Sequence, residues 1–278
     1  MEINKLYNGD ILDMFEKTPD SLIDLIVTSP PYNVGIDYDS WDDQKPIDEY
    51  FQWVENWLSE CYRTLKDDGR IAINIPYECN MGERVMISSE YWQIMKKVGF
   101  KFFGLVDLEE NSPHRVKTTA WGSWMSPSSP YIYNSKECVI LAYKNSAKKL
   151  EKGDSQWNYT EMDVDGKTKK VYSQKDKDEF MELVFSHWKY QNDSRPLTKA
   201  TFSQDIPDKA IKILTYKNDL VLDCFSGSGT TALSAKKLGR NYIGFELSKE
   251  YHKISEDRIE KVEQLKRIEK KSKEFFDY

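Results

Sequence analysis

One short segment near the end of the chain limits its fold more than any other. Residues 220–223 are apolar up to Asp223 and lead into the turn Cys-Phe-Ser-Gly-Ser-Gly, after which a helical pattern begins at Thr230. Glycine lets the backbone approach a ligand closely, and the start of a helix offers N–H groups that have no partner within the helix. A strand, a glycine turn and a helix in this order predict a parallel α/β sheet with a ligand site at the strand end.

An acidic residue stands where the next strand is expected to end. Residues 242–245 predict that strand, and Glu246 follows about 20 residues after the glycine turn, where a carboxylate can accept both hydroxyls of a ribose. The turn lacks the third glycine of a dinucleotide motif and the Gly-Lys of a phosphate-binding loop. The pattern predicts a cofactor that contains adenosine without identifying it, and a nicotinamide-dependent oxidoreductase stays a distant alternative.

The rest of the chain alternates strand and helix patterns. Strands are expected over residues 22–27, 70–75, 100–108 and 137–143, and helices over residues 47–65, 91–98, 207–214 and 250–273. Residues 47–65 place apolar side chains three and four positions apart, which is one face of a helix. Residues 70–75 are nearly all apolar, as in a parallel strand covered on both faces. We therefore predict an α/β protein with a mostly parallel, twisted sheet flanked by helices.

A corner with two prolines follows the first predicted strand, in the run Thr-Ser-Pro-Pro-Tyr-Asn. Pro30 and Pro31 donate no backbone hydrogen bond and hold φ near about −65°, so the chain leaves the sheet rigidly and its carbonyls are fixed acceptors. The Ser29 side chain and the Pro30 carbonyl are suited to hold the protons of an exocyclic amine, while the Tyr32 ring stacks on a planar base. The alternative is a purely structural role, in which the prolines give the chain a rigid exit from the strand and the aromatic side chain covers it.

These two motifs together identify a family resemblance. Residues 28–33 (TSPPYN) and residues 223–230 (DCFSGSGT) resemble the catalytic and cofactor motifs of the S-adenosylmethionine-dependent DNA amino-methyltransferases. The catalytic corner precedes the glycine turn, which is the permuted order of the beta group of that family. The resemblance implies a Rossmann-like methyltransferase fold and S-adenosyl-L-methionine as the cofactor. It also implies double-stranded DNA as the substrate, with direct methyl transfer to an exocyclic amine after base flipping.

The resemblance also assigns roles to individual residues. It places the catalytic corner at Ser29, Pro30, Pro31 and Tyr32. It places the cofactor pocket at Asp10, in an early Gly-Asp element, at Phe202, in a segment that closes over the methionine part, at Glu246, and at the turn residues Asp223, Phe225, Ser226, Gly227, Gly229 and Thr230. No metal is expected in the site.

The identity of the target base depends on Ser29. Serine at this position is commoner in enzymes that act on the N4 amine of cytosine, so the resemblance favours N4-cytosine, with N6-adenine as the alternative. Methylation at carbon 5 would need a cysteine nucleophile after a proline, and none of the four cysteines follows a proline. A protein or RNA amine or amide methyltransferase is a second alternative, because a Pro-Pro-Tyr corner also serves glutamine side chains.

Motifs and charge divide the chain into three predicted parts. Residues 1–143 carry the catalytic corner, residues 144–195 are expected to be the target-recognition segment, and residues 196–278 carry the cofactor motif and a C-terminal helix. The formal net charge is −6, from 40 Lys and Arg against 46 Asp and Glu, which excludes a wholly basic nucleic-acid coat. Lysines gather in the middle part and are candidates for phosphate contacts, with a solvated segment of mixed charge as the equal alternative. They are Lys148, Lys149, Lys167, Lys169, Lys170, Lys175 and Lys177.

The remaining features predict the environment and the partners. No apolar run is long enough to span a membrane and no leader precedes the first strand, so we expect a cytoplasmic protein without membrane contact. Four cysteines without CxxC spacing and three histidines predict buried thiols rather than a zinc site or disulfides. The apolar stripe in residues 250–273 and the habits of the family favour a homodimer, and a cognate restriction endonuclease is the expected partner.

Overall fold

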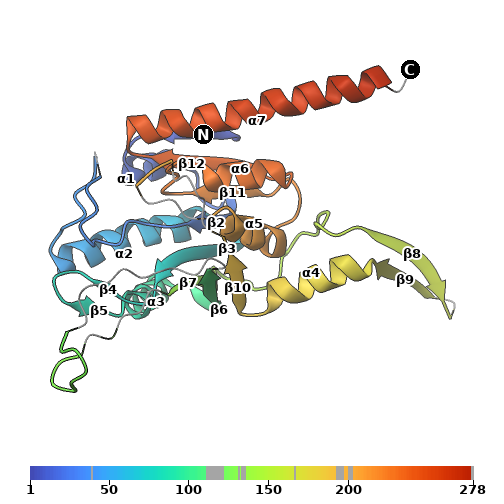
Figure 1. Cartoon of the computed structure of the whole chain (residues 1–278). Helices are drawn as coiled ribbons and strands as arrows, with labels where there is room; N and C mark the ends of the chain where they lie inside the picture. Colours follow the sequence, from blue (N-terminus) through green and yellow to red (C-terminus); the bar gives the residue numbers. More distant parts are fainter. Residues whose placement is uncertain are drawn as a thin grey trace.

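The computed structural model describes residues 1–38, 40–110, 122–130, 132, 136–165, 167–191, 197–199 and 203–276. Eight of its strands form one sheet: β1 (Lys5–Asn8), β2 (Ile23–Thr28), β3 (Leu65–Pro76), β6 (Lys101–Glu110), β7 (Glu137–Tyr143), β10 (His187–Tyr190), β11 (Leu220–Asp223) and β12 (Asn241–Glu246). Their order is β1-β12-β11-β2-β3-β7-β6-β10 (Figure 1). All neighbours pair in parallel except β7, which is antiparallel to β3 and β6. The mostly parallel sheet predicted from the sequence is confirmed.

Helices cover both faces of this sheet. They are α1 (Ile11–Glu16), α2 (Ile47–Thr64), α3 (Ile87–Val98), α5 (Asp205–Leu214), α6 (Thr230–Lys237) and α7 (Lys249–Phe276). The helix α4 (Gln174–Val184) lies outside these layers and contacts α5. The buried side chains of α1, α2 and α3 pack in one apolar core, and those of α5, α6 and α7 pack in another. Alternate residues of the same strand enter the two cores, as Leu222 and Val221 of β11 do. The central strands are therefore buried on both sides, which explains their nearly continuous apolar sequence.

The starts of two elements differ from the prediction by four or five residues. β3 begins at Leu65, directly at the end of α2, rather than at residue 70, because Leu65 already pairs with Ile23 of β2 before a register shift. Its early residues include Lys66, whose Nζ lies 2.8 Å from a carboxylate oxygen of Asp24. The helix α3 begins at Ile87, four residues before the predicted start. Both differences come from contacts across the fold that local sequence patterns do not report.

The predicted target-recognition segment consists of three structurally different pieces. Residues 144–158 lead back along the body, where the Lys144 backbone N–H donates to the carbonyl of Gly69 at 3.0 Å. The hairpin β8 (Tyr159–Val164) and β9 (Lys167–Tyr172), with α4, projects from the body; we call residues 159–184 the arm (Figure 1). The following strand β10 returns to the main sheet and pairs with β6. The division into three functional parts stays a prediction.

Several further expectations can be compared with the structure. The second small hairpin, β4 (Cys79–Asn80) with β5 (Arg84–Val85), was not expected. Between β6 and β7, only residues 122–130, 132 and 136 are described. Among the cysteines, Cys61, Cys138 and Cys224 are buried as predicted, and Cys79 is only partly buried. In the described part of the chain, no helix has both the length and the apolar character needed to cross a membrane.

The apolar stripe of α7 is partly used inside the protein. Ile259 is buried in the core that α5 and α6 share, and Ile254 is partly covered. The helix contacts β1 and β12 at its start and then extends beyond the body (Figure 1). Two of the residues that first indicated a homodimer, Ile254 and Ile259, are therefore already covered within the chain, and the dimer stays a prediction.

Candidate active site

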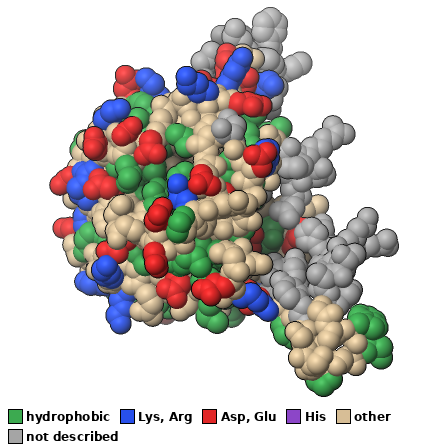
Figure 2. Space-filling view, turned by 90° about the vertical axis from the view of Figure 1, so that its left-hand side faces the viewer, with side chains coloured by type: hydrophobic (Ala, Val, Ile, Leu, Met, Phe, Trp, Pro, Cys, Tyr) green, Lys and Arg blue, Asp and Glu red, His purple; other side chains and the backbone are tan. Residues whose placement is uncertain are grey.

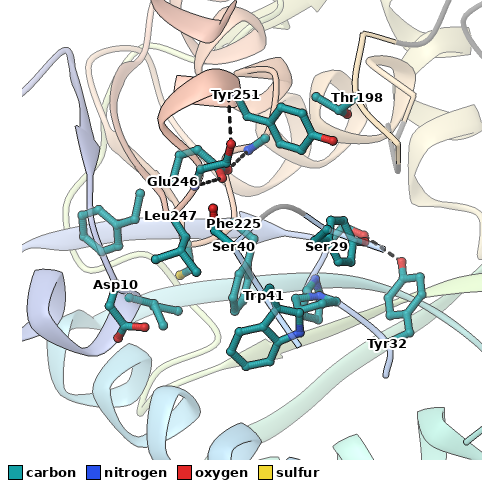
Figure 3. Close-up of a pocket in the computed structure, with 18 of the residues that line it drawn as sticks. Asp10, Ser29, Tyr32, Ser40, Trp41, Thr198, Phe225, Glu246, Leu247 and Tyr251 are labelled. Atoms are coloured by element: carbon teal, nitrogen blue, oxygen red, sulfur yellow. Dashed lines mark hydrogen bonds between the residues drawn. The ribbon is translucent and has the colours of Figure 1, made fainter. Parts of the chain in front are cut away.

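A cavity of about 300 Å³ lies where β1, β2, β11 and β12 reach their carboxyl ends. Residues that follow each of these strands line it, which is where ligands bind in open parallel sheets. Ser29 and Tyr32 lie together on one side, Asp10 lies on the opposite side, and Glu246 and Trp41 lie between them (Figure 3). The cavity thus has a corner side, at the Pro-Pro turn, and a carboxylate side.

The corner side is a rigid turn with a chain of hydroxyl groups. The Ser29 Oγ lies 2.7 Å from the Tyr32 hydroxyl (Figure 3). That hydroxyl donates to the Asn74 backbone carbonyl at 3.2 Å. From the core, the Tyr50 hydroxyl donates to the Pro31 carbonyl at 2.8 Å. Burial, followed by the nearby Glu137, raises the pKa of Tyr32 well above its usual value, so the phenol keeps its proton. The turn is held from both sides and presents Ser29 to the cavity.

The loop after the corner is held by one buried carboxylate. Asp43, which is 3% exposed, accepts backbone N–H groups from four successive residues, numbers 33 to 36, at 2.9 to 3.1 Å. The Asn33 side chain donates to the Lys45 backbone carbonyl and accepts the Lys45 backbone N–H, and the Asn33 backbone has a positive φ of 60°. This network fixes the loop that carries Trp41 against the cavity, where its ring contacts Trp53 at 4.5 Å between centroids.

The carboxylate side is organised by Glu246. One of its oxygens accepts the Gly227 N–H at 2.7 Å and the other accepts the Ser248 N–H at 2.8 Å. Glu246 also lines the cavity, so a carboxylate held in place by backbone N–H groups faces any ligand bound there. Gly227 has a φ of +50°, and among the described residues no atom lies within 4 Å of the position where its Cβ would be. The glycine turn therefore leaves open space beside a fixed carboxylate.

Asp223 lies behind the cavity wall rather than on it. It is 1% exposed, and its Oδ1 accepts the Thr28 hydroxyl at 2.7 Å and the Phe225 N–H at 3.1 Å. Burial raises the pKa of this carboxyl. Because Thr28 ends β2 and Asp223 ends β11, the pair ties the Pro-Pro corner to the glycine turn.

The structure brings most of the predicted site residues together. On the cavity wall are Asp10, Ser29, Pro30, Pro31, Tyr32, Phe225, Gly227 and Glu246. Behind the wall are Asp223, Ser226, Gly229 and Thr230, and Phe202 lies outside the described residues. Asp10 also caps α1 by accepting the Leu12 N–H at 2.9 Å. Gly229 starts α6 with a φ of +78°, and a Cβ there would lie 2.9 Å from the Ser255 Cβ.

Other wall residues were not predicted as site residues. The aromatic side chains are Tyr38, Trp41, Trp53, Tyr190, Phe245 and Tyr251, and the one added carboxylate in the described wall is Glu137. Trp41 lies shortly after the second proline, so its closeness to a recognised motif was a usable signal. Glu137 and Tyr190 had no such signal, because they reach the cavity through the pairing of β7 with β3 and of β10 with β6.

The lysines of residues 144–177 do not form one basic surface. Lys149 is 9% exposed, and its Nζ lies 3.4 Å from Asp24, 3.9 Å from Asp68 and 3.5 Å from Asp219. It neutralises carboxylates of the body and is not available to phosphate, which corrects the expectation for this residue. On the face drawn in Figure 2, acidic and basic side chains are interspersed rather than gathered by sign. Within the described residues, no group of three His, Cys, Asp or Glu side chains is placed to hold a metal ion.

Comparison with known proteins agrees with this geometry. A family model, DNA methylase of the N6/N4 type, matches residues 23–257. The Type II methyltransferase M.MjaVI of Methanocaldococcus jannaschii is 44% identical over 150 residues, which are 54% of this chain and 75% of that protein.

Solved structures extend the likeness to the whole fold. PvuII DNA methyltransferase, described as cytosine-N4-specific, aligns with a TM-score of 0.65 and 21% identity over 90% of this chain and 84% of its own. A Thermus thermophilus protein, TTHA0409, was solved with S-adenosyl-L-methionine. It aligns with a TM-score of 0.65 and 18% identity, over 91% of this chain and 92% of its own. The predicted Rossmann-like methyltransferase fold is confirmed. The chain belongs to the N6/N4 DNA methylase family, the DNA amino-methyltransferases that its two motifs resemble.

Proposed function

We propose that this protein transfers a methyl group from S-adenosyl-L-methionine to the N4 amine of a cytosine in double-stranded DNA. The observation that carries the proposal is the position of Ser29, beside Tyr32 and on the same cavity wall as Glu246. One end of the cavity offers neutral hydrogen-bond acceptors for an amine. The other offers a fixed carboxylate for a ribose.

The direction of the hydrogen bonds at the corner makes Ser29 an acceptor. Tyr32 has a single hydroxyl proton, and it donates that proton to the Asn74 carbonyl. The Ser29 hydroxyl must then donate to the Tyr32 oxygen, which leaves the lone pairs of Oγ for an incoming N–H. With the Pro30 carbonyl as a second acceptor, both protons of an exocyclic amine are held, and its nitrogen lone pair points away from the corner.

The residues on the carboxylate side fit an adenosine-containing cofactor. Glu246 places a fixed carboxylate in the cavity at the end of β12, where ribose hydroxyls are bound in such folds, and the open space at Gly227 admits a ligand close to the backbone. Tyr38, Trp41 and Tyr251 supply flat apolar surface for a purine ring. When bound, S-adenosyl-L-methionine supplies a methyl group on a positively charged sulfur, and no protein nucleophile is required. The protein contributes orientation, exclusion of water and hydrogen bonds.

The choice of cytosine rests on Ser29 and on one structural relative. An uncharged hydroxyl occupies the position that the resemblance gives to Asp or Asn in most adenine enzymes. PvuII DNA methyltransferase, which shares the fold, is cytosine-N4-specific. A base reaches the cavity only outside the duplex, so flipping toward Tyr32 is part of the proposal. We also propose that the methylation is sequence-specific and belongs to a restriction–modification system, as in Type II relatives such as M.MjaVI.

The test is to incubate the protein with labelled S-adenosyl-L-methionine and unmodified phage DNA, digest the DNA to nucleosides and identify the labelled one. Label on cytosine N4 is the expected result. Label on adenine N6 would show that the target base is adenine rather than cytosine, and the protein would still be a DNA amino-methyltransferase. Absence of label in DNA, with label in RNA or protein added in parallel, would overturn the proposal. The Ser29→Ala variant should bind the cofactor normally and transfer the label slowly.

A further inference from the structure

Glu137 is the wall residue for which the proposed function supplies no role. It begins β7 and lines the cavity, and its side chain is partly buried. Its Oε2 accepts the Asn74 side-chain N–H at 2.7 Å, and the backbone carbonyl of the same Asn74 accepts the Tyr32 hydroxyl at 3.2 Å. Glu137 is therefore connected through one residue to the hydroxyl chain that ends at Ser29, so it lies on the corner side of the cavity.

The surroundings of Glu137 favour its neutral form. Burial raises the pKa of this carboxyl, Glu110 raises it further by repulsion, and only the bond from Asn74 acts in the opposite direction. Tyr190, on the same wall, has a pKa raised to about 12 by burial and by these two carboxyls, so it carries no charge. Asn74 makes Oε2 the acceptor oxygen. When this acid is protonated, its proton is carried by Oε1, for which no partner lies among the described residues, and Oε1–H is then a donor available to the cavity.

We propose that Glu137 reads the target base, by donating Oε1–H to the ring nitrogen beside the amine that Ser29 accepts. This inference rests on the proposed function and adds a specificity-determining residue to it. In this proposal the Ser29 Oγ accepts and the Glu137 Oε1–H donates, so the same cavity offers the base one acceptor and one donor. Cytosine, with its N4 amine and N3, and adenine, with its N6 amine and N1, present the complementary donor and acceptor.

The same pair of groups rejects the other two bases. Thymine and guanine carry an oxygen where the amine would be and an N–H at the neighbouring ring nitrogen, so each would face like groups. A site with buried polar groups rejects a mismatched partner strongly, because the groups left unpaired lose their solvation. The Glu137–Asn74 pair thus accounts for selection of amine-bearing bases in general, while Ser29 bears on the choice between cytosine and adenine.

The test compares Glu137→Gln with Glu137→Leu. A glutamine can turn its oxygen to Asn74 and its N–H to the cavity, so the donor is kept, whereas leucine fills similar space without a donor. We expect kcat/KM for methyl transfer within about threefold of wild type for E137Q and lower by about tenfold to a hundredfold for E137L. The affinity for S-adenosyl-L-methionine should be the same in all three proteins. Glu109→Gln, which removes an exposed carboxylate from the neighbouring strand β6, is the matched control and should leave transfer unchanged.

A modified substrate tests the wild-type protein without any substitution. The substrate is an unmethylated duplex that contains the sequence recognised by the protein. In it, C–H replaces the ring nitrogen beside the target amine. Wild type should lose about tenfold or more in kcat/KM on this duplex, and E137L should lose little beyond its own defect. Equal losses in both proteins, or an E137Q as slow as E137L, would overturn the inference. Wild-type transfer to the unmodified duplex shows in the same experiment that the proposed function holds independently of Glu137.

Discussion

The wall of the cavity and the arm are built in opposite ways. Around the cavity, side chains are bonded to backbone groups of other segments, as Glu246 is to Gly227 and Asp43 is to four successive N–H groups. In the arm, β8 and β9 pair only with each other, and most of their side chains are exposed. The cavity therefore has a fixed shape before any ligand arrives. The arm can change its exposed residues with little effect on the fold.

Charge follows the same division. In the arm, Lys170 lies opposite Glu161 in the strand register, and its Nζ also lies 3.9 Å from the Tyr159 ring centre. Such exposed pairs contribute little to stability and leave the lysines accessible. In the body, Lys149 is enclosed by carboxylates. Two lysines from one Lys-rich stretch thus belong to different structural environments, a difference that substitutions can measure.

The largest effect is expected from Lys149→Met. This change removes the ammonium group that faces the carboxylates of Asp24, Asp68 and Asp219. Asp24 keeps Lys66 as a partner, so the loss falls mainly on the other two carboxylates. Breaking a buried ion pair by removing one partner costs about 3–5 kcal/mol, so the free energy of unfolding in urea should fall by about 3 kcal/mol. The neighbouring exposed Lys148→Met should change it by less than about 0.5 kcal/mol. Equal free energies of unfolding for the two variants would contradict this prediction. Lys149 would then contribute as little to stability as the exposed lysines of the arm.

The second prediction concerns the carboxylate side of the cavity. Glu246→Ala removes the acceptor of two backbone N–H groups and the proposed partner of the ribose. Loss of charged hydrogen bonds worth about 1.5–3 kcal/mol each should weaken S-adenosyl-L-methionine binding by about a hundredfold, as measured by calorimetry. Glu250→Ala, exposed at the start of α7, is the control with unchanged affinity. Unchanged affinity of E246A for S-adenosyl-L-methionine would show that Glu246 does not bind the cofactor.

Tyr32→Ala tests the corner side. It removes the proposed stacking surface and the hydroxyl between Ser29 and Asn74. Base stacking is worth about 1–3 kcal/mol, so kcat/KM for DNA should fall by about tenfold to a hundredfold while cofactor affinity stays the same. Tyr32→Phe keeps the ring and should lose less, in line with one neutral hydrogen bond. A parallel loss of cofactor binding and transfer in Y32A would mean that Tyr32 only supports the fold.

The smallest effect is expected in the arm. Lys169 is exposed on β9 opposite Met162, and a contact with one phosphate releases about one counterion. Lys169→Gln should reduce the slope of log K against log salt by about one and weaken DNA binding equally for all sequences. Lys97→Gln on α3, whose Nζ already pairs with Glu55, serves as the control. An unchanged slope of log K against log salt in K169Q would show that this lysine does not contact a DNA phosphate.

Sequence reasoning succeeded where one segment determines its own structure. The glycine turn, the Pro-Pro corner and the amphipathic helix α2 are local patterns, and the structure brings the first two to one cavity. It failed for β10, whose four residues His-Trp-Lys-Tyr have no period long enough to detect and gain strand geometry by pairing with β6. It also missed Glu137, because the bond from Asn74 that gives this residue its orientation joins two strands far apart in sequence.

The fixed carboxylate of Glu246 has a consequence for turnover. If it holds the ribose as proposed, its bonds to Gly227 and Ser248 are the same before and after methyl transfer, because none of these groups touches the reacting atoms. Contacts that do not change during the reaction bind the substrate and the product equally well. The demethylated cofactor should therefore compete strongly with S-adenosyl-L-methionine. Release of this product, rather than the chemical step, would then limit the rate at which the protein methylates successive sites.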